Sequence, residues 1–561
     1  MLTRRDFLQV AAAASVVMSG ASLARASARQ SITQETLLAM KPVGQVTLLN
    51  FTDIHAQLMP LYFREPSVNL GVGAAHGLVP HLSGKAFLNA YGIKAGTAEA
   101  YALTHEDFAA LAKTYGRVGG LDRMATLVKA VRAARPDNTL LIDCGDTWQG
   151  SYTALMNKGE DMVEAMNLLG VDVMVPHWEF TYGEARVKEL IAKLKFPFLA
   201  QNVKDTEWEE DAFPHTATFE RGGVKIAVIG QAFPYTPVAN PRYMMPKWSF
   251  GIRDEDMQKR IDDARANGAE LIVVASHNGF DVDRKMASRV KGIDVLLTGH
   301  THDAIPAVVK VGDTLLVASG SHGKFLARLD LEVKNKKVVS HAFKLMPVFA
   351  DAIAADAEMA ALIAKIRAPH QAVLGRKLAR TESLLYRRGN FNGTFDDLIC
   401  QALLDERQAE ISLSPGFRWG SSVPSGADIT LEDVYNQTAI TYPNAYRSDM
   451  TGQLLKDILE DVADNLFNPD PYYQQGGDMV RVGGMGYRID IAKPMGSRIS
   501  DMTMLKTGAK IEAAKSYVVS GWASVNEGTQ GPPVWDVVAG WLEKHPRVRF
   551  DGNRAVKVVG A

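Results

Sequence analysis

The chain has 561 residues, which is too long for one hydrophobic core, so two domains are expected. Hydrophobic residues make up 47% and charged residues 22%, as in ordinary globular proteins. The formal net charge of −1 gives no reason to expect nucleic acid or an anionic membrane as a partner.

The first residues have the pattern of a cleavable export signal. The basic pair Arg4-Arg5 precedes an apolar run from Val10 to Val17, and Ala26-Ser27-Ala28 has the form of a cleavage site. The paired arginines resemble a twin-arginine signal, and the apolar run is too short to span a bilayer. We therefore expect residues 1–28 to be removed near Ala28 and the mature protein to be soluble in the periplasm.

Buried strands that end in polar motifs characterise residues 40–347. Continuous apolar runs alternate with helical patterns, which is typical of sheets covered by helices. The carboxyl ends of such strands are where α/β folds place their sites. Five predicted strands lead into side chains of metal-ligand type: 45–50 into Asp53-Ile54-His55, 139–142 into Gly145-Asp146, 173–175 into His177, 271–275 into His277, and 295–297 into Gly299-His300-Thr301-His302.

Other segments complete the predicted organisation. A Gly- and Ala-rich insertion covers about residues 70–116, and an amphipathic helix begins at Gly119-Gly120. Residues 348–379 are predicted to form a long Ala-rich connecting helix. Residues 380–561 are predicted to form a second α/β unit, with helices near 395–408 and 454–466 and strands near 481–491 and 515–519.

The carboxylates and imidazoles at the strand ends predict a metal centre. They are too many for one four-coordinate site, but they fill two sites that share a bridging aspartate. Mixed carboxylate and imidazole ligands favour Mn, Zn or Fe over Mg or Ca. One such motif is a weak signal, whereas the ordered set is strong evidence. The predicted ligands are Asp53, His55, Asp146, His177, His277, His300 and His302.

These ordered motifs resemble those of the calcineurin-like metallophosphoesterases, and more closely those of the 5′-nucleotidase family. The likeness extends to Phe417-Arg418 and to the segment from Ile429 to Val434 in the second half of the chain. It implies a four-layer αββα metallophosphoesterase sandwich over residues 40–347 and a 5′-nucleotidase-type α/β substrate domain over residues 380–561. By position, one divalent ion, most simply Mn, would be held by Asp53, His55, Asp146 and His302, and the other by Asp146, His177, His277 and His300.

One motif departs from the family pattern. Residues 175–183 read Val-Pro-His-Trp-Glu-Phe-Thr-Tyr-Gly where the family normally has Gly-Asn-His-Glu-Phe-Asp-Tyr-Gly. His177 replaces a metal-binding asparagine and keeps a ligand, whereas Trp178 and Thr181 replace a catalytic His–Asp pair. An indole N–H cannot deliver a proton. We therefore expect a substrate with a good leaving group, and a pocket that Trp178 shapes.

The altered block, together with the export signal and Gln201-Asn202-Val203, is similar to the SoxB sulfohydrolases, an exported branch of this family. The resemblance implies hydrolysis of a cysteine S-thiosulfonate on a Sox carrier protein, whose flexible carboxy-terminal arm would enter the cleft between the domains. A hydroxide that bridges the two metals, together with Asp146, would attack the sulfonate sulfur. Arg418, Asn202 and Arg64 are the candidate substrate-binding residues, and an ordinary structural role is the alternative for each.

Other functions remain open from the sequence alone. One is a periplasmic 5′-nucleotidase or 2′,3′-cyclic nucleotide phosphodiesterase, for which the aromatic candidates are scattered: Phe417, Trp419, Tyr442 and Tyr473. Another is a binding protein that keeps the metals for structure only. A histidine of the insertion is also an alternative replacement for the lost pair; the candidates are His76, His81 and His105.

Overall fold

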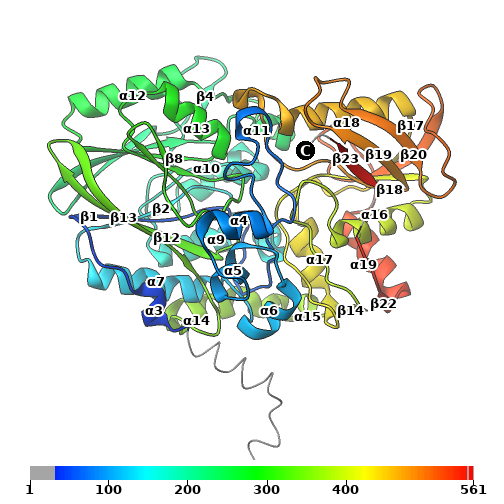
Figure 1. Ribbon diagram of the computed structural model, residues 1–561, viewed down its shortest axis with the longest axis horizontal. Helices are drawn as coiled ribbons and strands as arrows, with labels where there is room; N and C mark the ends of the chain where they lie inside the picture. The colour runs from blue at the N-terminus through cyan, green and yellow to red at the C-terminus, as the bar shows by residue number, and fades with distance from the viewer. Residues whose placement is uncertain (1–31, 553–554, 560–561) are drawn as a thin grey trace, which may run out of the picture.

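The computed structural model describes residues 32–552 and 555–559, so the export signal predicted for residues 1–28 lies outside the described residues. Two units lie side by side in Figure 1: the first half of the chain on the left and the last third on the right. The metal-ligand motifs all belong to the first unit, as the sequence predicts.

Two stacked sheets form the centre of the first unit (Figure 1). In each sheet the strands that carry the predicted motifs are neighbours and run parallel. The first sheet has the order β13 (Lys337–Pro347), β12 (Phe325–Lys334), β1 (Val46–Phe51), β2 (Thr139–Asp143) and β3 (Val173–Met174). The second has the order β10 (Val309–Val311), β11 (Thr314–Ala318), β9 (Val295–Thr298), β8 (Leu271–Ser276), β6 (Val224–Gln231) and β5 (Thr216–Arg221).

Helices cover the outer faces of both sheets. Along β8, Val273 packs into the core shared with the first sheet, whereas Ile272 and Val274 pack under α12 (Asp254–Ala266) and α13 (Phe280–Arg289). This alternation follows from the two-residue period of a strand that is buried on both faces. Helices α7 (Leu121–Ala134) and α9 (Glu160–Leu169) cover the first sheet, so the unit has the predicted αββα layers.

The segment predicted as one long connecting helix is divided. Helix α14 covers only Ala357–Arg367, and a 3₁₀ turn at Ala368–His370 and the short α15 (Gln371–Leu374) follow it. Pro369 explains the interruption, because proline lacks the N–H that a continuing helix requires. Helix α14 packs on α7 and α9 and belongs to the first unit. The insertion is also helical, with α4 (Gly84–Tyr91), α5 (Ala98–Leu103) and α6 (Phe108–Tyr115).

The second unit is an α/β domain with three small sheets. Its helices are α16 (Thr394–Glu406), α17 (Leu431–Thr438), α18 (Gly452–Phe467) and α19 (Val534–Lys544). Its sheets have the orders β16-β14-β22, β17-β21-β15-β18 and β20-β19-β23. The strands are β14 (Lys377–Thr381), β15 (Ile411–Ser414), β16 (Asp428–Thr430), β17 (Tyr446–Thr451), β18 (Arg481–Gly483), β19 (Met485–Asp490), β20 (Ile499–Met504), β21 (Ser516–Gly521), β22 (Arg547–Val548) and β23 (Val556–Val559).

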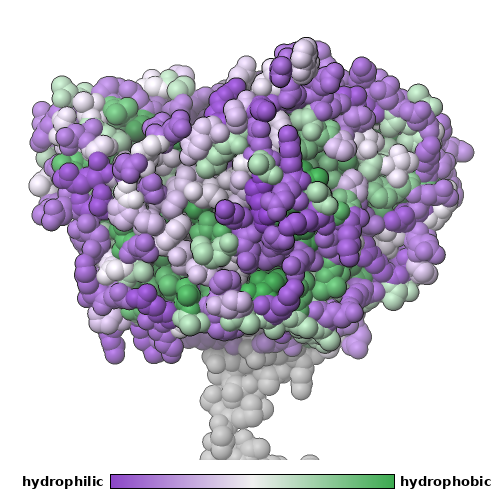
Figure 2. Space-filling view, turned by 180° about the vertical axis from the view of Figure 1, so that it is seen from behind, coloured by the Kyte–Doolittle hydropathy of each residue, from purple (hydrophilic) through white to green (hydrophobic). Residues whose placement is uncertain are grey.

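The outer surface is mostly polar. The face drawn in Figure 2 is largely hydrophilic, and its hydrophobic residues gather in separate patches. Within residues 32–552 and 555–559, every helix is too short or too polar to cross a bilayer.

Candidate metal centre

Parallel strands bring the predicted ligands together. Asp53 and His55 follow β1, Asp146 follows β2 and His177 follows β3, while His277 and the pair His300 and His302 follow β8 and β9 of the second sheet. Because the carboxyl ends of parallel strands meet at one edge, these side chains converge where the two sheets face each other. All seven side chains are buried.

The ligand backbone adopts a conformation that few residues tolerate. Asp53, His55, Asp146, His300 and His302 all have left-handed φ angles, between 49° and 74°. Such angles are unfavourable for residues with a Cβ and persist only when surrounding contacts enforce them, typically at functional sites. Backbone hydrogen bonds provide that support: Asp53 N donates to Gly145 O and His55 N donates to Asp146 O, each at 2.8 Å.

The first ligand group comprises Asp53, His55, Asp146 and His302, whose ligand atoms all lie within 4.8 Å of one another. His55 Nε2 and His302 Nε2 face each other at 3.2 Å, and His302 Nε2 lies 3.1 Å from Asp53 Oδ1. Two facing ring nitrogens form a hydrogen bond only if one of them carries a hydrogen. A metal cation between them accepts the lone pairs of both. These residues therefore fit a metal ion.

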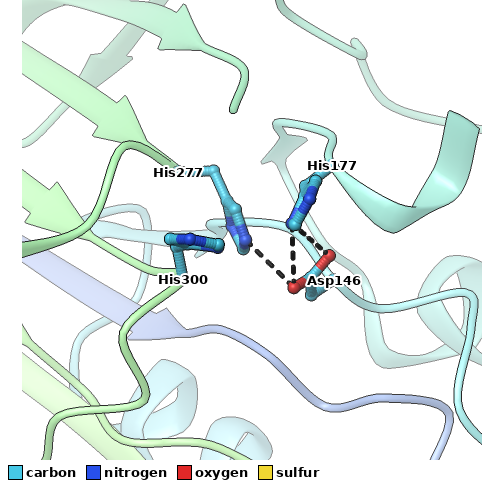
Figure 3. A group of neighbouring side chains, drawn as sticks. All are labelled: Asp146, His177, His277 and His300. Carbon is cyan, nitrogen blue, oxygen red and sulfur yellow. Dashed lines mark hydrogen bonds and ion pairs between the residues drawn. The ribbon is translucent and has the colours of Figure 1, made fainter. Parts of the chain in front are cut away.

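The second group comprises Asp146, His177, His277 and His300, again with all ligand atoms within 4.8 Å (Figure 3). His177 and His277 point toward the Asp146 carboxylate in this view: His177 Nδ1 lies 3.1 Å from Oδ1 and His277 Nε2 lies 3.1 Å from Oδ2. The other nitrogen of His277 faces Cys144 O, the arrangement that orients metal-binding imidazoles. Asp146 belongs to both groups, as a bridging ligand must.

Burial and charge set the protonation of the ligands. Burial lowers the pKa of His55, His300 and His302 and brings the pKa of His177 to about 4, so these imidazoles are neutral, the form that binds metal. His277 differs, because the Asp146 and Asp53 carboxylates outweigh burial and raise its pKa to about 10. The two carboxylates thus require positive charge at this position, which a metal ion also provides.

A buried glutamate that sequence reasoning missed holds two ligand loops in place. Glu179 Oε1 accepts hydrogen bonds from the backbone N–H groups of Thr147 at 2.7 Å and Trp148 at 3.1 Å, and its Oε2 accepts one from His177 N at 2.7 Å. The Trp178 backbone N–H donates to Asp146 Oδ1 at 2.8 Å. The main chain of residue 178, and not its side chain, therefore makes the hydrogen bond to the shared ligand Asp146.

A cavity of about 160 Å³ opens beside the two ligand groups, and Trp178 lines it as predicted. The indole packs edge-on against Phe417 and Trp419, with ring centroids 5.4 and 5.0 Å away, and those two rings stack on each other at 4.1 Å. Phe417 and Trp419 come from the second domain. The side chain at position 178 therefore forms part of an aromatic wall that joins the domains.

Thr181 also contacts the second domain. Its Oγ1 lies 2.6 Å from Thr441 Oγ1, and the Thr441 hydroxyl donates to Thr181 O at 3.1 Å. Trp178 and Thr181, which occupy the positions of the family's catalytic pair, therefore both contact the second domain.

Arg418 lies at the cavity, as the sequence predicts. Its Nη2 donates to Gly477 O at 2.6 Å and its Nε lies 3.5 Å from Asp478 Oδ1, whereas Nη1 has no hydrogen-bond partner among the described residues. Asp478 and the Gly476-Gly477 pair line the same cavity, and a Cβ at Gly476 would overlap His300 Nε2. The sequence reading missed this glycine pair, although two adjacent glycines before an aspartate are a recognisable signal for close backbone approach.

Asn202 and Arg64, the other two predicted substrate-binding residues, make local structural contacts. The Asn202 side chain is fully buried, donates to Ala232 O and Gly251 O and accepts from Ala232 N, so its amide holds backbone segments together. The Arg64 guanidinium lies over the Tyr386 ring, 4.1 Å from its centroid, and donates to Glu65 O. Neither is among the described residues that line the metal cavity.

The insertion histidines lie elsewhere. His81 pairs with Asp281 at 2.6 Å and lines a smaller neighbouring cavity of about 50 Å³. His105 lies beside Glu106, and His76 is exposed. None of the three is among the described residues that line the metal cavity. The histidine that does lie beside the ligands is His322, four residues after the buried strand β11, which the sequence analysis did not single out.

Comparisons with known proteins agree with this geometry. The sequence profile of the 5′-nucleotidase C-terminal domain family matches residues 377–538. The 5′-nucleotidase of Rattus norvegicus is 25% identical over 437 residues, which cover 70% of this chain and 74% of the relative. The structure of the sulfate thiohydrolase SoxB of Thermus thermophilus is similar at a TM-score of 0.89 and 35% identity, over 93% of this chain and 98% of that one. A 5′-nucleotidase precursor from the same organism shares the fold, with a TM-score of 0.72 and 21% identity over 92% of this chain and 100% of that one.

Proposed function

Because the chain belongs to the SoxB branch of the 5′-nucleotidase family of metal-dependent hydrolases, we propose that it releases sulfate from a cysteine S-thiosulfonate on a Sox carrier protein. In this reaction a water oxygen bonds to the sulfonate sulfur, and the bond between that sulfur and the adjacent inner sulfur breaks. The bonding electrons leave with the inner sulfur, which gives sulfate and a carrier persulfide.

One observation carries the proposal: the aromatic side chain of Trp178 stands beside the metal ligands where a proton donor would stand. Its ring packs against Phe417 and Trp419, so neither it nor its neighbours in the wall can deliver a proton. General acid catalysis contributes about 10²–10⁴-fold where an alkoxide must leave. A persulfide leaves as a stable anion and does not need that help.

The residues of the cavity have distinct tasks in this reaction. Two divalent ions, most simply Mn, supply an activated water and polarise the sulfonate oxygens when bound to the two ligand groups. Arg418 offers its unpartnered Nη1 to a sulfonate oxygen, while its contacts with Gly477 and Asp478 hold the guanidinium in place. Trp178, Phe417 and Trp419 exclude bulk water from the scissile sulfur–sulfur bond.

The cavity suits an extended chain end rather than a rigid domain. Glycines 416, 476 and 477 line it from the second domain without side chains, and Gly476 lies so close to His300 that a Cβ would overlap the imidazole. We propose that a flexible carboxy-terminal arm of the carrier enters here and that the reaction takes place in the periplasm, where the amino-terminal signal pattern would direct the protein.

The direct test is sulfate release from purified carrier that bears a cysteine thiosulfonate, with the metal-loaded protein. We expect release with loaded wild-type protein and none with the Asp146→Asn variant. Hydrolysis of AMP is assayed in parallel. Fast AMP hydrolysis without sulfate release would reject the proposal in favour of a nucleotidase, the function of the curated relatives.

A further inference from the structure

His322 occupies an unusual position between the metal centre and the second domain. It lies in the loop between β11 and β12, is fully buried and has a left-handed φ of 57°. Its backbone N–H donates to Asp53 O at 2.8 Å, so its main chain is fixed to a ligand residue. A non-glycine residue with such a φ is held there by surrounding contacts.

The ring of His322 packs among the metal-ligand imidazoles. Its centroid lies 5.6 Å from that of His55, 5.7 Å from that of His302 and 4.3 Å from that of Phe63. Nδ1 lies 2.8 Å from Ser321 Oγ. The ring is thus fixed on the metal side by packing and by one polar contact.

The other ring nitrogen reaches the second domain. His322 Nε2 accepts a hydrogen bond from the Gly420 backbone N–H at 3.2 Å. This contact assigns the ring hydrogen to Nδ1, where it faces the Ser321 hydroxyl. Gly420 follows directly on Phe417, Arg418 and Trp419, the residues that form the far wall of the metal cavity.

Gly420 is held from its other side as well. It is buried with a φ of 127°, and a Cβ there would overlap Gln437 Oε1. Gln437 Nε2 donates to Ser421 O at 2.8 Å. The chain at residues 420–421 is therefore fixed between His322 of the first domain and Gln437 of the second.

We infer that His322 is a positioning residue: through Gly420 it fixes the loop of residues 416–420, and with it Arg418, at a set place opposite the metal ligands. A histidine that only filled the core would not need an acceptor directed at the other domain. The position of this loop sets the geometry of the cavity, whichever substrate the cavity takes.

The first test measures amide hydrogen exchange of residues 416–421 in the full-length, metal-loaded protein. His322→Phe keeps a ring against Phe63 but removes the acceptor, so we expect exchange in this segment to accelerate about tenfold, as for one lost buried hydrogen bond. His322→Gln retains an acceptor near the position of Nε2 and should restore most of the protection. The exposed His76→Phe variant is the matched control. Unchanged exchange in His322→Phe would overturn the inference.

The second test separates positioning from metal support. We expect His322→Phe to keep the wild-type metal content by elemental analysis, and kcat/KM for the thiosulfonated carrier to fall about 10- to 100-fold, mainly through KM. Loss of metal from this variant would assign His322 to ligand support instead and overturn the inference. Because exchange and metal content need no substrate, failure of the proposed function leaves these outcomes readable.

Discussion

The two walls of the metal cavity are built in different ways. On the first-domain wall, each ligand directly follows a buried strand, and five ligand residues have left-handed backbones enforced by hydrogen bonds. The opposite wall consists of two loops of the second domain, residues 416–420 and 475–478. The first carries Phe417, Arg418 and Trp419 between two glycines, and the second carries Asp478 after two glycines. The first wall holds the residues that could bind metal, and we propose that the second selects the substrate.

Two residues of the metal-ligand domain connect it to the second domain. The positions that would hold a proton-transfer pair belong to the first domain, yet Trp178 contacts Trp419 of the second wall and Thr181 contacts Thr441 elsewhere in the second domain. Relative to the family pattern, the change therefore replaces the proton-transfer pair by interdomain packing, while His177 keeps a metal-binding group where the family has asparagine.

The largest effect is expected on the first wall. Asp146→Asn removes the carboxylate shared by the two ligand groups, so both ions lose a charged ligand. We expect metal content to fall below two ions per chain and sulfate release to drop about 10³-fold or more, because a metal contributes several kcal/mol to the transition state. Elemental analysis and the sulfate assay measure both. Full activity with an asparagine at position 146 would show that the bridging arrangement is wrong.

The first wall should also respond to pH, in a direction set by His277. Its folded pKa of about 10 lies above the usual histidine value of 6.5, so this group stabilises the metal-free fold below pH 6.5 and loses that contribution as the pH rises toward 10. Metal binding must displace the same proton. We therefore expect proton release on metal binding at pH 7–9 and an affinity that rises about tenfold per pH unit.

Calorimetry in buffers of different ionisation enthalpy measures this proton release. His177→Asn is the matched control: His177, with a pKa of about 4, has already lost its proton, so release should persist. His277→Asn should reduce it; burial also raises the pKa of Asp53, so this ligand can release a proton as well. Equal enthalpies in all buffers would contradict the charge assignment of the centre.

The first wall is also the part that the sequence predicts well. All seven ligands and their division into two groups agree with the structure, because a strand-end motif fixes both the position and the direction of a side chain. The uninterrupted apolar runs predict sheets covered by helices, whereas the four-layer arrangement is implied by the resemblance to the metallophosphoesterases.

The second wall is harder to predict, because loop positions depend on contacts between distant segments. The sequence singled out Arg418 but not its partners Gly477 and Asp478, and it assigned substrate contacts to Asn202 and Arg64. Both of these pack locally against backbone or an aromatic ring, which no spacing rule reveals. His322 escaped notice because its role requires the second domain as a partner.

A smaller effect is expected from the charge on the second wall. Arg418→Met keeps most of the side-chain volume but removes the positive charge and the guanidinium donors of a residue that lines the cavity. We expect kcat/KM for the thiosulfonated carrier to fall about 10- to 100-fold, mainly through KM, as for a lost charged hydrogen bond. Steady-state kinetics checks this. Arg64→Met is the matched control and should change kcat/KM by less than about threefold, because its guanidinium lies over Tyr386 outside the cavity. Similar losses in both variants would mean that the wall has been assigned wrongly.

The smallest effect, and the sharpest comparison of the two walls, comes from restoring the proton-transfer pair with Trp178→His and Thr181→Asp. The double substitution removes two edge-on aromatic contacts and the contact between Thr181 and Thr441. We expect the free energy of unfolding to fall by about 1–3 kcal/mol, and AMP hydrolysis to stay within about tenfold of wild type, because the second wall still excludes a nucleotide. Thermal denaturation and phosphate release measure the two effects, and Trp178→Phe, which keeps an aromatic ring, is the control for stability. A stable variant with fast AMP hydrolysis would contradict substrate selection by the second wall. The first wall alone would then select the substrate, and the aromatic contacts between the domains would have no part in that selection.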